Sequence, residues 1–271
     1  MDTIELIAAT YAWHQSYGHS VEDTPLARYV SNVQHPDIWV ANHVSLVRAR
    51  EPAEIDEVLH QADRALTHCT HRMFIVDPST PPAFAARLAF ASYKELSPML
   101  HMVLHGSVGA PGATVDLRRV ASDEDWTVLA KLVRANHQEA PVHGLVLDKT
   151  ITDGIVAAYR AKSIVAPFFL ARVGGVDCAY GSAVVGPFGM GIVEDLFTLP
   201  AYRKRGLATA IVAHVVAHAR ALGMGPMLIG AVGGELPKTL YGSLGFMPQC
   251  LTRQYLRDSS VTFARVRSSA S

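Results

Sequence analysis

The stretch that decides the fold is Ile192 to Ala210, IVEDLFTLPAYRKRGLATA. An apolar strand ends at Pro200, and a basic loop then leads directly into a helix. The loop and the start of that helix follow the pattern R-x-x-G-x-A, in which Gly206 and Ala208 leave room for close approach to the main chain. N–H groups in the first turn of a helix have no intrahelical acceptor, and the helix dipole adds roughly half a positive charge there. The stretch therefore predicts an anion site suited to a pyrophosphate.

A second motif follows at Leu240 to Phe246, LYGSLGF, where Tyr241 precedes the helix-ending Gly245 by one turn. In this order and at this spacing, the two motifs resemble the GNAT superfamily of acyl-CoA-dependent N-acyltransferases. A basic surface loop and an ordinary glycine C-cap would explain each motif separately. These explanations would not account for the two motifs occurring together in this order and at this distance along the chain.

The resemblance implies a set of residues that bind acetyl-CoA, the expected acyl donor, and it implies no metal. The main chain of the strand before the loop pairs with the pantetheine arm, and the loop and helix start wrap the pyrophosphate. The residues concerned are Leu196, Phe197, Thr198, Arg203, Lys204, Arg205, Gly206, Leu207, Ala208 and Thr209. Two positions depart from the family pattern: Gly234 stands where many relatives have asparagine, and Ile229 where some have a base.

Two side chains are candidates for the chemistry, in which a neutral amine attacks the thioester and a thiolate leaves. Glu194 is the candidate base, because strand alternation predicts that it shares a face with Thr198. Asp195, expected on the opposite face, is the second choice, and an ordered water is a third. Tyr241 is the candidate acid, since a phenol is protonated at neutral pH. The alternatives are a carboxylate that is solvated or paired with an arginine, and a tyrosine that only packs.

Composition narrows the class of protein. The chain has 271 residues with 24 basic and 24 acidic side chains, and a net charge of zero argues against a nucleic-acid binder. Its three cysteines lack disulfide or zinc spacing and indicate a reducing compartment. The acidic N-terminus is unlike a signal peptide, and no apolar run is long enough for a membrane span, so we expect a cytoplasmic protein.

Thirteen histidines raise the question of a metal site. His214 and His218 lie four residues apart, but the segment lacks the glutamate of H-E-x-x-H. We expect most histidines to be ordinary surface or core residues. The exceptions are His137 and His143, which the resemblance places near the acceptor site.

The clearest break in the chain is the segment GSVGAPGA at Gly106 to Ala113. It predicts an N-terminal α/β domain at 1–110 and a GNAT domain at 113–271. The fold class is α/β, of the α+β kind, with a mixed and mostly antiparallel central sheet flanked by helices. In the larger domain the pattern predicts the order β-α-α-β-β-β-α-β-α-β-β, ending in a strand pair from Phe246 to Leu256.

The first half of the chain is predicted to contain strands at 39–48, 72–76 and 99–104 and helices at 52–66 and 82–93. This order mirrors the second half of a GNAT domain and suggests a degenerate partial repeat. The loop from Arg48 to Pro52 contains no glycine, so a phosphate could not approach its main chain. An unrelated α/β domain is the alternative.

The expected function is transfer of an acetyl group from acetyl-CoA to a primary amine, by direct attack and on a small molecule. Acylation of a protein or peptide amine, or CoA-responsive binding without turnover, are the alternatives. We expect no nucleic-acid or membrane partner, and a homodimer remains open.

Overall fold

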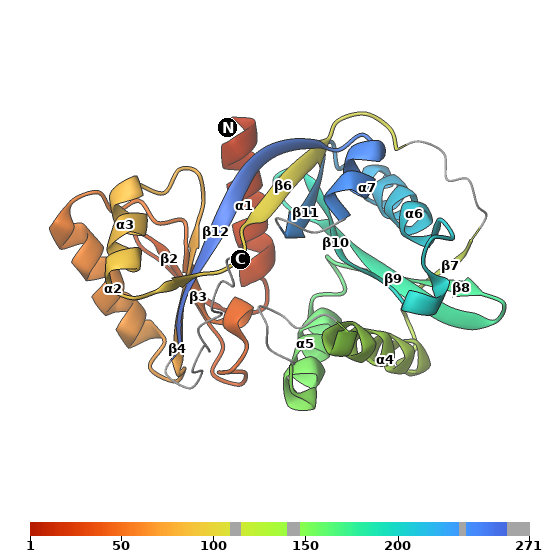
Figure 1. Ribbon diagram of the computed structural model, residues 1–271, viewed down its shortest axis with the longest axis horizontal. Helices are drawn as coiled ribbons and strands as arrows, with labels where there is room; N and C mark the ends of the chain where they lie inside the picture. The colour runs from red at the N-terminus through yellow and green to blue at the C-terminus, as the bar shows by residue number, and fades with distance from the viewer. Residues whose placement is uncertain (109–114, 140–146, 233–236, 259–271) are drawn as a thin grey trace, which may run out of the picture.

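The computed structural model describes residues 1–108, 115–139, 147–232 and 237–258. Within them, twelve strands form one mixed sheet in the order β1-β2-β3-β4-β12-β6-β11-β10-β9-β8-β7, with β5 beside β12. Helices flank this sheet, and the molecule has two halves joined along β6 and β12 (Figure 1). The expected fold class is confirmed.

The C-terminal half of the sheet has helices on both faces. Its strands are β7 (Asp116–Arg119), β8 (Phe168–Val173), β9 (Val176–Val185), β10 (Gly191–Thr198) and β11 (Met227–Val232). Helices α4 (Asp123–Glu139) and α5 (Lys149–Ala161) lie on one side, and α6 (Leu207–Ala221) and α7 (Pro237–Ser243) on the other (Figure 1). Apolar side chains of α6, such as Ile211 and Val215, are fully buried against β9 and β10. On the other face, Trp126 and Leu129 of α4 pack against Phe168 and Tyr180.

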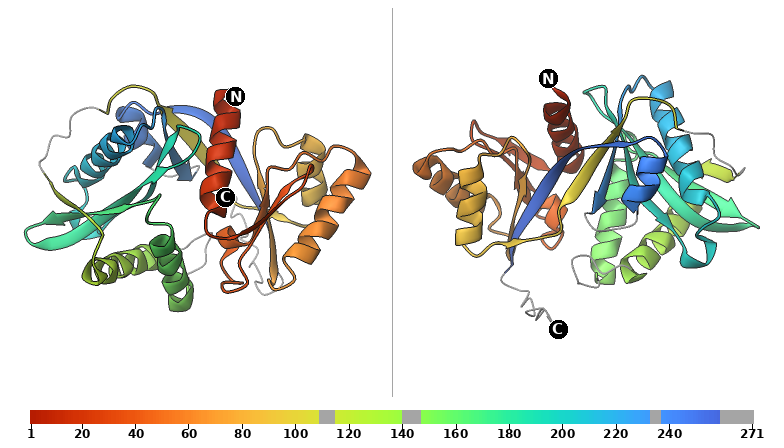
Figure 2. Two further views of the ribbon diagram at one scale, coloured as in Figure 1. Left: turned by 180° about the vertical axis from the view of Figure 1, so that it is seen from behind. Right: turned by 45° about the horizontal axis from the view of Figure 1, so that its top comes forward.

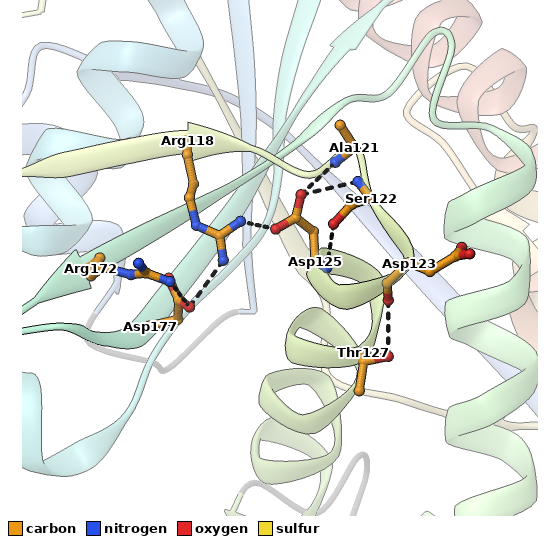
Figure 3. A network of polar contacts seen from close by, with 8 residues as sticks. All are labelled: Arg118, Ala121, Ser122, Asp123, Asp125, Thr127, Arg172 and Asp177. Atoms are coloured by element: carbon orange, nitrogen blue, oxygen red, sulfur yellow. Dashed lines mark hydrogen bonds and ion pairs between the residues drawn. The ribbon is translucent and has the colours of Figure 1, made fainter.

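A network of charged groups joins β7 to the start of α4 (Figure 3). Arg118 on β7 pairs with Asp125 of α4 and, at 3.0 Å, with Asp177 of β9. The Asp125 carboxylate also accepts hydrogen bonds from the backbone N–H groups of Ala121 and Ser122. A negative charge is stabilised at a helix N-terminus, so this acid both caps α4 and positions it on the sheet.

The N-terminal half follows the element order and strand directions of the C-terminal half from β8 onward, with the two-residue β5 in addition. Its elements are β1 (Ser20–Asp23), β2 (Arg28–Ser31), β3 (His43–Ser45), α2 (Pro52–Ala65), β4 (His71–Val76), α3 (Pro82–Phe90), β5 (Lys94–Glu95) and β6 (Met99–Leu104). Strands β1, β2 and β3 are antiparallel and β3 is parallel to β4, just as β8, β9 and β10 are antiparallel and β10 is parallel to β11. This correspondence supports the partial repeat.

Several elements of this half differ from the expectation. The strand expected at 39–48 is a 3-10 turn, Trp39–Ala41, followed by the short β3, and β1 and β2 were not expected. The main chain of Leu46, just after β3, has a positive φ of 52°, which ends the strand there.

The two halves exchange strands at their junction. Strand β6 lies between β11 and β12, so a strand that precedes the expected domain boundary completes the C-terminal part of the sheet. Strand β12 (Met247–Asp258) pairs with β6 through its first part and with β4 through its second (Figures 1 and 2). The expected strand pair from Phe246 to Leu256 is thus wrong: a single strand continues because each part finds its own partner. The sheet crosses the expected boundary, part of which (109–113) lies outside the described residues, and the division into domains stays a prediction.

Helix α1 (Thr3–Ser16) stands at the junction of the halves (Figure 2). Asp2 and Glu5 form a capping box at its start. Its Ile7 and Tyr11 are buried in a cluster with side chains of β6, β9, β10 and β11. At its other end Trp13 leaves so little space that a Cβ on Gly186 would lie 2.9 Å from the indole ring. The helix therefore holds the N-terminal segment beside β10. Within the described ranges, no helix combines the length and apolar character needed to cross a bilayer.

Candidate active site

The site is organised by a bulge in β10. From Glu194 to Phe197 this strand advances three residues while its partner β9 advances two, and Asp195 has a positive φ of 55°. Glu194 therefore shares its face with Phe197, and the expectation that it shares a face with Thr198 is wrong. Asp195 also turns towards α5, where it bonds to Tyr159, instead of pointing to the face opposite Glu194. Past Val193, β10 has no recorded pairing with β11 in the described sheet.

The first cavity at this bulge, which we call the α6 cavity, has a volume of about 760 Å³. It is lined by all the expected coenzyme-binding residues except Arg205, and by the candidate acid, Tyr241. The lining residues are Asn136, Leu196, Phe197, Thr198, Tyr202, Arg203, Lys204, Gly206, Leu207, Ala208, Thr209, Leu240 and Tyr241. Asn136, Tyr202 and Leu240 were not expected: Asn136 on α4 and Tyr202 in a 3-10 turn (Pro200–Tyr202) belong to no motif, and Leu240 begins the second motif but had no role assigned to it.

The N-terminus of α6 is open towards this cavity. Gly206 is its N-cap, with a φ of 77°, and no side chain caps the helix. The Arg203 guanidinium instead pairs with Glu139 at 2.6 Å and donates to the Thr198 carbonyl at 3.0 Å. Arg205 donates to a backbone carbonyl and lies over the Tyr202 ring. The two arginines brace the loop, and the helix N–H groups are left for an anion.

The corresponding helix of the other half, α2, has a closed N-terminus. Glu51 and Glu54 form a capping box, and the Glu54 carboxylate accepts from the N–H groups of Arg50 and Glu51 at 2.7 and 3.1 Å. A carboxylate already occupies the place of an anion. The N-terminal half therefore lacks the open helix end that a pyrophosphate needs.

The second cavity, which we call the carboxylate cavity, lies on the other side of the bulge and has a volume of about 320 Å³. Glu194 and Asp195 line it together with residues of α1, α5 and the 32–41 segment. The hydroxyl of Tyr11 donates to Glu194 at 3.2 Å, and that of Tyr159 donates to Asp195 at 2.5 Å. Both halves of the chain thus build this cavity around two neighbouring acids.

Burial makes both acids unusually basic, and the charge of Asp195 adds to the effect on Glu194. Burial raises the pKa of Glu194 to about 8, and the neighbouring charge of Asp195 adds to the shift. Burial also raises the pKa of Asp195. The phenol pKa values of Tyr11 and Tyr159 rise well above 10 through burial and the adjacent carboxylates, so both remain hydrogen-bond donors. A carboxylate with a pKa near 8 can take a proton from an ammonium group far better than an ordinary one.

The candidate acid Tyr241 and the histidines singled out in the sequence lie in separate parts of the fold. Tyr241 is buried and its ring lies 6.4 Å from that of Phe246. His137 is hydrogen-bonded to Thr152, outside both cavities, and His143 lies outside the described residues. His214 and His218 pack edge-on against Phe169. In the part of the chain that the structure describes, no group of three or more His, Cys, Asp or Glu side chains could hold a metal ion.

Tyr11 and Tyr159 were missed as site residues. Tyr159 was expected to be a core residue, and its position on α5 alone says nothing about a carboxylate 36 positions later. Tyr11 belongs to a helix that the sequence reading did not detect. The only available signal was that each is an amphipathic aromatic residue, which buries its ring and needs a partner for its hydroxyl.

An open helix N-terminus and a buried acid pair both line cavities beside β10, the bulged strand. Residues 141–246 match the model of the acetyltransferase (GNAT) family, so the chain contains a GNAT domain there. No curated protein matches the chain.

Solved structures share the fold over most of the chain. A GCN5-related N-acetyltransferase from Kribbella flavida has a TM-score of 0.71 at 16% identity, covering 96% of each chain. A conserved protein of unknown function from Staphylococcus epidermidis has a TM-score of 0.69 at 11% identity, covering 91% of this chain and 97% of its own. A tandem GNAT protein from the clavulanic acid biosynthesis pathway has a TM-score of 0.56 at 16% identity, covering 81% and 76%. The similarity extends to a tandem arrangement of the fold.

Proposed function

We propose that this protein transfers the acetyl group of acetyl-CoA to a primary amine of a small molecule. The observation that carries the proposal is the position of the two cavities. The α6 cavity offers an open helix N-terminus and Tyr241, and the carboxylate cavity offers a buried acid pair. Both are lined by consecutive residues of β10, so a thioester in the first would lie next to an amine in the second.

In this proposal each residue has one task. The main chain of Leu196 to Thr198 pairs with the pantetheine arm, and the first turn of α6 binds the pyrophosphate. Glu194 accepts the proton of the substrate ammonium, so that the amine attacks the thioester carbonyl as a neutral nucleophile. Tyr241 donates a proton to the sulfur as the carbon–sulfur bond breaks, so CoA leaves as a thiol, and the second proton that the nitrogen loses as the amide forms restores the tyrosine hydroxyl.

The test is release of free CoA thiol from acetyl-CoA in the presence of a panel of primary amines and peptides. Turnover with small amines supports the proposal, whereas turnover only with peptides or protein lysines contradicts the small-molecule acceptor. Tight binding of acetyl-CoA by calorimetry, with no thiol released by any amine, would identify a CoA-responsive binding protein instead.

A further inference from the structure

The carboxylate cavity also contains a cation that neither acid neutralises. Lys162, the residue after α5, lines the cavity, and its ammonium lies 5.6 Å from the centre of the Tyr159 ring. Its charge offsets part of the rise that burial causes in the pKa values of Glu194 and Asp195. All three residues are described, yet no ion pair within 4.0 Å joins Lys162 to either acid.

Tyr159 separates the two kinds of charge. Its hydroxyl donates to Asp195, while its ring face holds the Lys162 ammonium by a cation–π contact. The acid pair and the cation are therefore held apart within one cavity by a side chain that contacts both.

Two imidazoles of the N-terminal half, those of His19 and His35, line the cavity together with Lys162. The charges of Lys162 and His35 both lower the pKa of His19, after the larger effect of burial, and His19 is hydrogen-bonded to Asn32 at 3.1 Å. His19, Asn32 and His35 line the same cavity as Lys162. With the lysine they form a polar group rich in hydrogen-bond donors, which we call the Lys162 cluster.

The cavity is small and closely walled. Its volume of about 320 Å³ lies at the low end of the range for small-molecule sites. Helix α5 and the 32–41 segment pack so closely that a Cβ on Gly154 would lie 3.0 Å from Nδ1 of His35. This wall favours a compact ligand over a protein segment.

We propose that the acceptor is a compact primary amine that carries a carboxylate, as a free amino acid does. Its ammonium group lies at Glu194 and Asp195, and its carboxylate lies at the Lys162 cluster. A diamine would bring a second cation against Lys162, and a simple alkylamine would leave that lysine without an anion. Only a zwitterion satisfies both ends, through charge-assisted hydrogen bonds at each. This inference rests on the proposed function, since it assigns the acceptor of the same site.

The test compares amino acids with their amides, which keep the amine and the shape but lose the negative charge. Thiol release from acetyl-CoA is measured for α- and ω-amino acids, each beside its amide. Wild type should prefer the best carboxylate substrate over its amide by about 10- to 100-fold in kcat/KM, as loss of one charge-assisted contact predicts. Lys162→Met should abolish that preference: turnover of the amino acid should fall about 10- to 100-fold more than turnover of the amide, which loses only the effect of the Lys162 charge on the pKa of Glu194.

Lys149→Met is the matched control. Lys149 lies at the other end of α5, is exposed and pairs with Asp153, so its loss removes the same charge from the same helix outside the cavity. The preference for the carboxylate should be unchanged in this variant, and thermal unfolding checks that both variants fold.

Several results would overturn the inference. Equal rates with amino acids and amides in wild type would do so while leaving the acetyltransferase function standing. An equal loss for both substrates in Lys162→Met would assign the lysine a structural role. If no amine gives turnover, the proposed function fails, and calorimetric binding of amino acids then tests the inference without turnover. Binding about tenfold weaker to Lys162→Met than to wild type supports it, and unchanged binding overturns it.

Discussion

Glu194 and Asp195 show how one irregular residue changes the chemistry of a strand. In a regular strand, neighbouring side chains point to opposite faces, so only one of two adjacent acids could reach a given pocket. The positive φ of Asp195 inserts an extra residue and directs both acids into the carboxylate cavity. Burial away from water raises the pKa of both carboxyl groups, and the charge of Asp195 raises the pKa of Glu194 further.

The raised pKa of Glu194 leads to a pH-dependent prediction for Glu194→Gln. Only ionised Glu194 can accept a proton, so wild-type kcat/KM should rise about tenfold per pH unit and level off near pH 8. The variant depends on substrate that is already neutral, so its rate should keep rising up to the pKa of the amine. The ratio of wild-type to variant rates should therefore be constant below about pH 8 and fall above it, as measured by thiol release across pH 6–10.

Asp195→Asn is the control for this assignment. Glu194 is intact in this variant, so kcat/KM should still level off as the pH rises. The levelling should occur at lower pH than in wild type, because loss of the Asp195 charge lowers the pKa of Glu194. A ratio of wild type to Glu194→Gln that does not change with pH, at normal acetyl-CoA affinity, would rule out Glu194 as the base.

Tyr241→Phe should lower kcat far more than it weakens acetyl-CoA binding. A proton donor to the departing thiolate acts in the transition state, where general acid catalysis contributes about 10²- to 10⁴-fold. Tyr202→Phe is the matched control, because Tyr202 lines the same cavity but interacts with Arg205. We would measure kcat by steady-state kinetics or stopped flow, and the Kd of acetyl-CoA by calorimetry, for both variants. An unchanged kcat in Tyr241→Phe would show that this tyrosine only packs.

At the scale of elements, the helices α6 and α2 occupy equivalent places in the two halves but have different N-termini. Helix α6 begins at a glycine with no side-chain cap, whereas two glutamates cap α2. The free N–H groups of the helix start are left without a side-chain acceptor in the first case and are satisfied by the protein's own carboxylate in the second. An open helix start of this kind, which the proposed function needs, therefore belongs to α6 and not to α2.

Gly206→Glu should abolish acetyl-CoA binding by placing a carboxylate at the open end of α6. We expect Kd to rise about 100-fold or more, since charge-assisted contacts are lost and a repulsion is added. Gly223→Glu is matched to it, because Gly223 follows the other end of the same helix, also has a positive φ (85°) and has open space around its Cβ position. Both variants carry backbone strain, so calorimetry should find weak binding in the first only. Unchanged binding in Gly206→Glu would place the coenzyme elsewhere.

At the scale of the whole molecule, strand exchange makes the halves depend on each other. Strand β11 and the first part of β12 both pair with β6, which precedes the expected domain boundary. The carboxylate cavity likewise needs Tyr11 from α1 and residues of the 32–41 segment. Neither the sheet nor the cavity is complete without the N-terminal half.

Residues 113–271 produced alone should therefore fail to unfold cooperatively. Without β6, strands β11 and β12 would each expose an unpaired edge, and such edges promote aggregation. A segment that begins at Met99 restores β6 and should recover a cooperative thermal transition by circular dichroism. Cooperative unfolding of both segments with equal midpoints would contradict the structural importance of the exchanged strand.

Much of this architecture could be predicted from local patterns. The helix at Pro52–Ala65, the strand at Met227–Val232 and the loop around Gly206 were predicted because periodicity, proline and glycine act over a few residues. The bulge at Asp195 could not be predicted, because nothing in the local sequence overrides strand alternation. The roles of Tyr11 and Lys162 could not be predicted either, since their partners lie far away along the chain.

The sequence by itself determined the class of fold and the glycine-bearing loop that opens α6, because an R-x-x-G-x-A loop between a strand and a helix has its geometry encoded within a few residues. The tertiary structure alone decided which acids share a cavity, which cation stands near them and which half of the chain completes the sheet. These depend on contacts such as that between Tyr11 and Glu194, 183 positions apart. Burial and distance set the charges and pKa values of such groups, and both arise only when remote segments pack together.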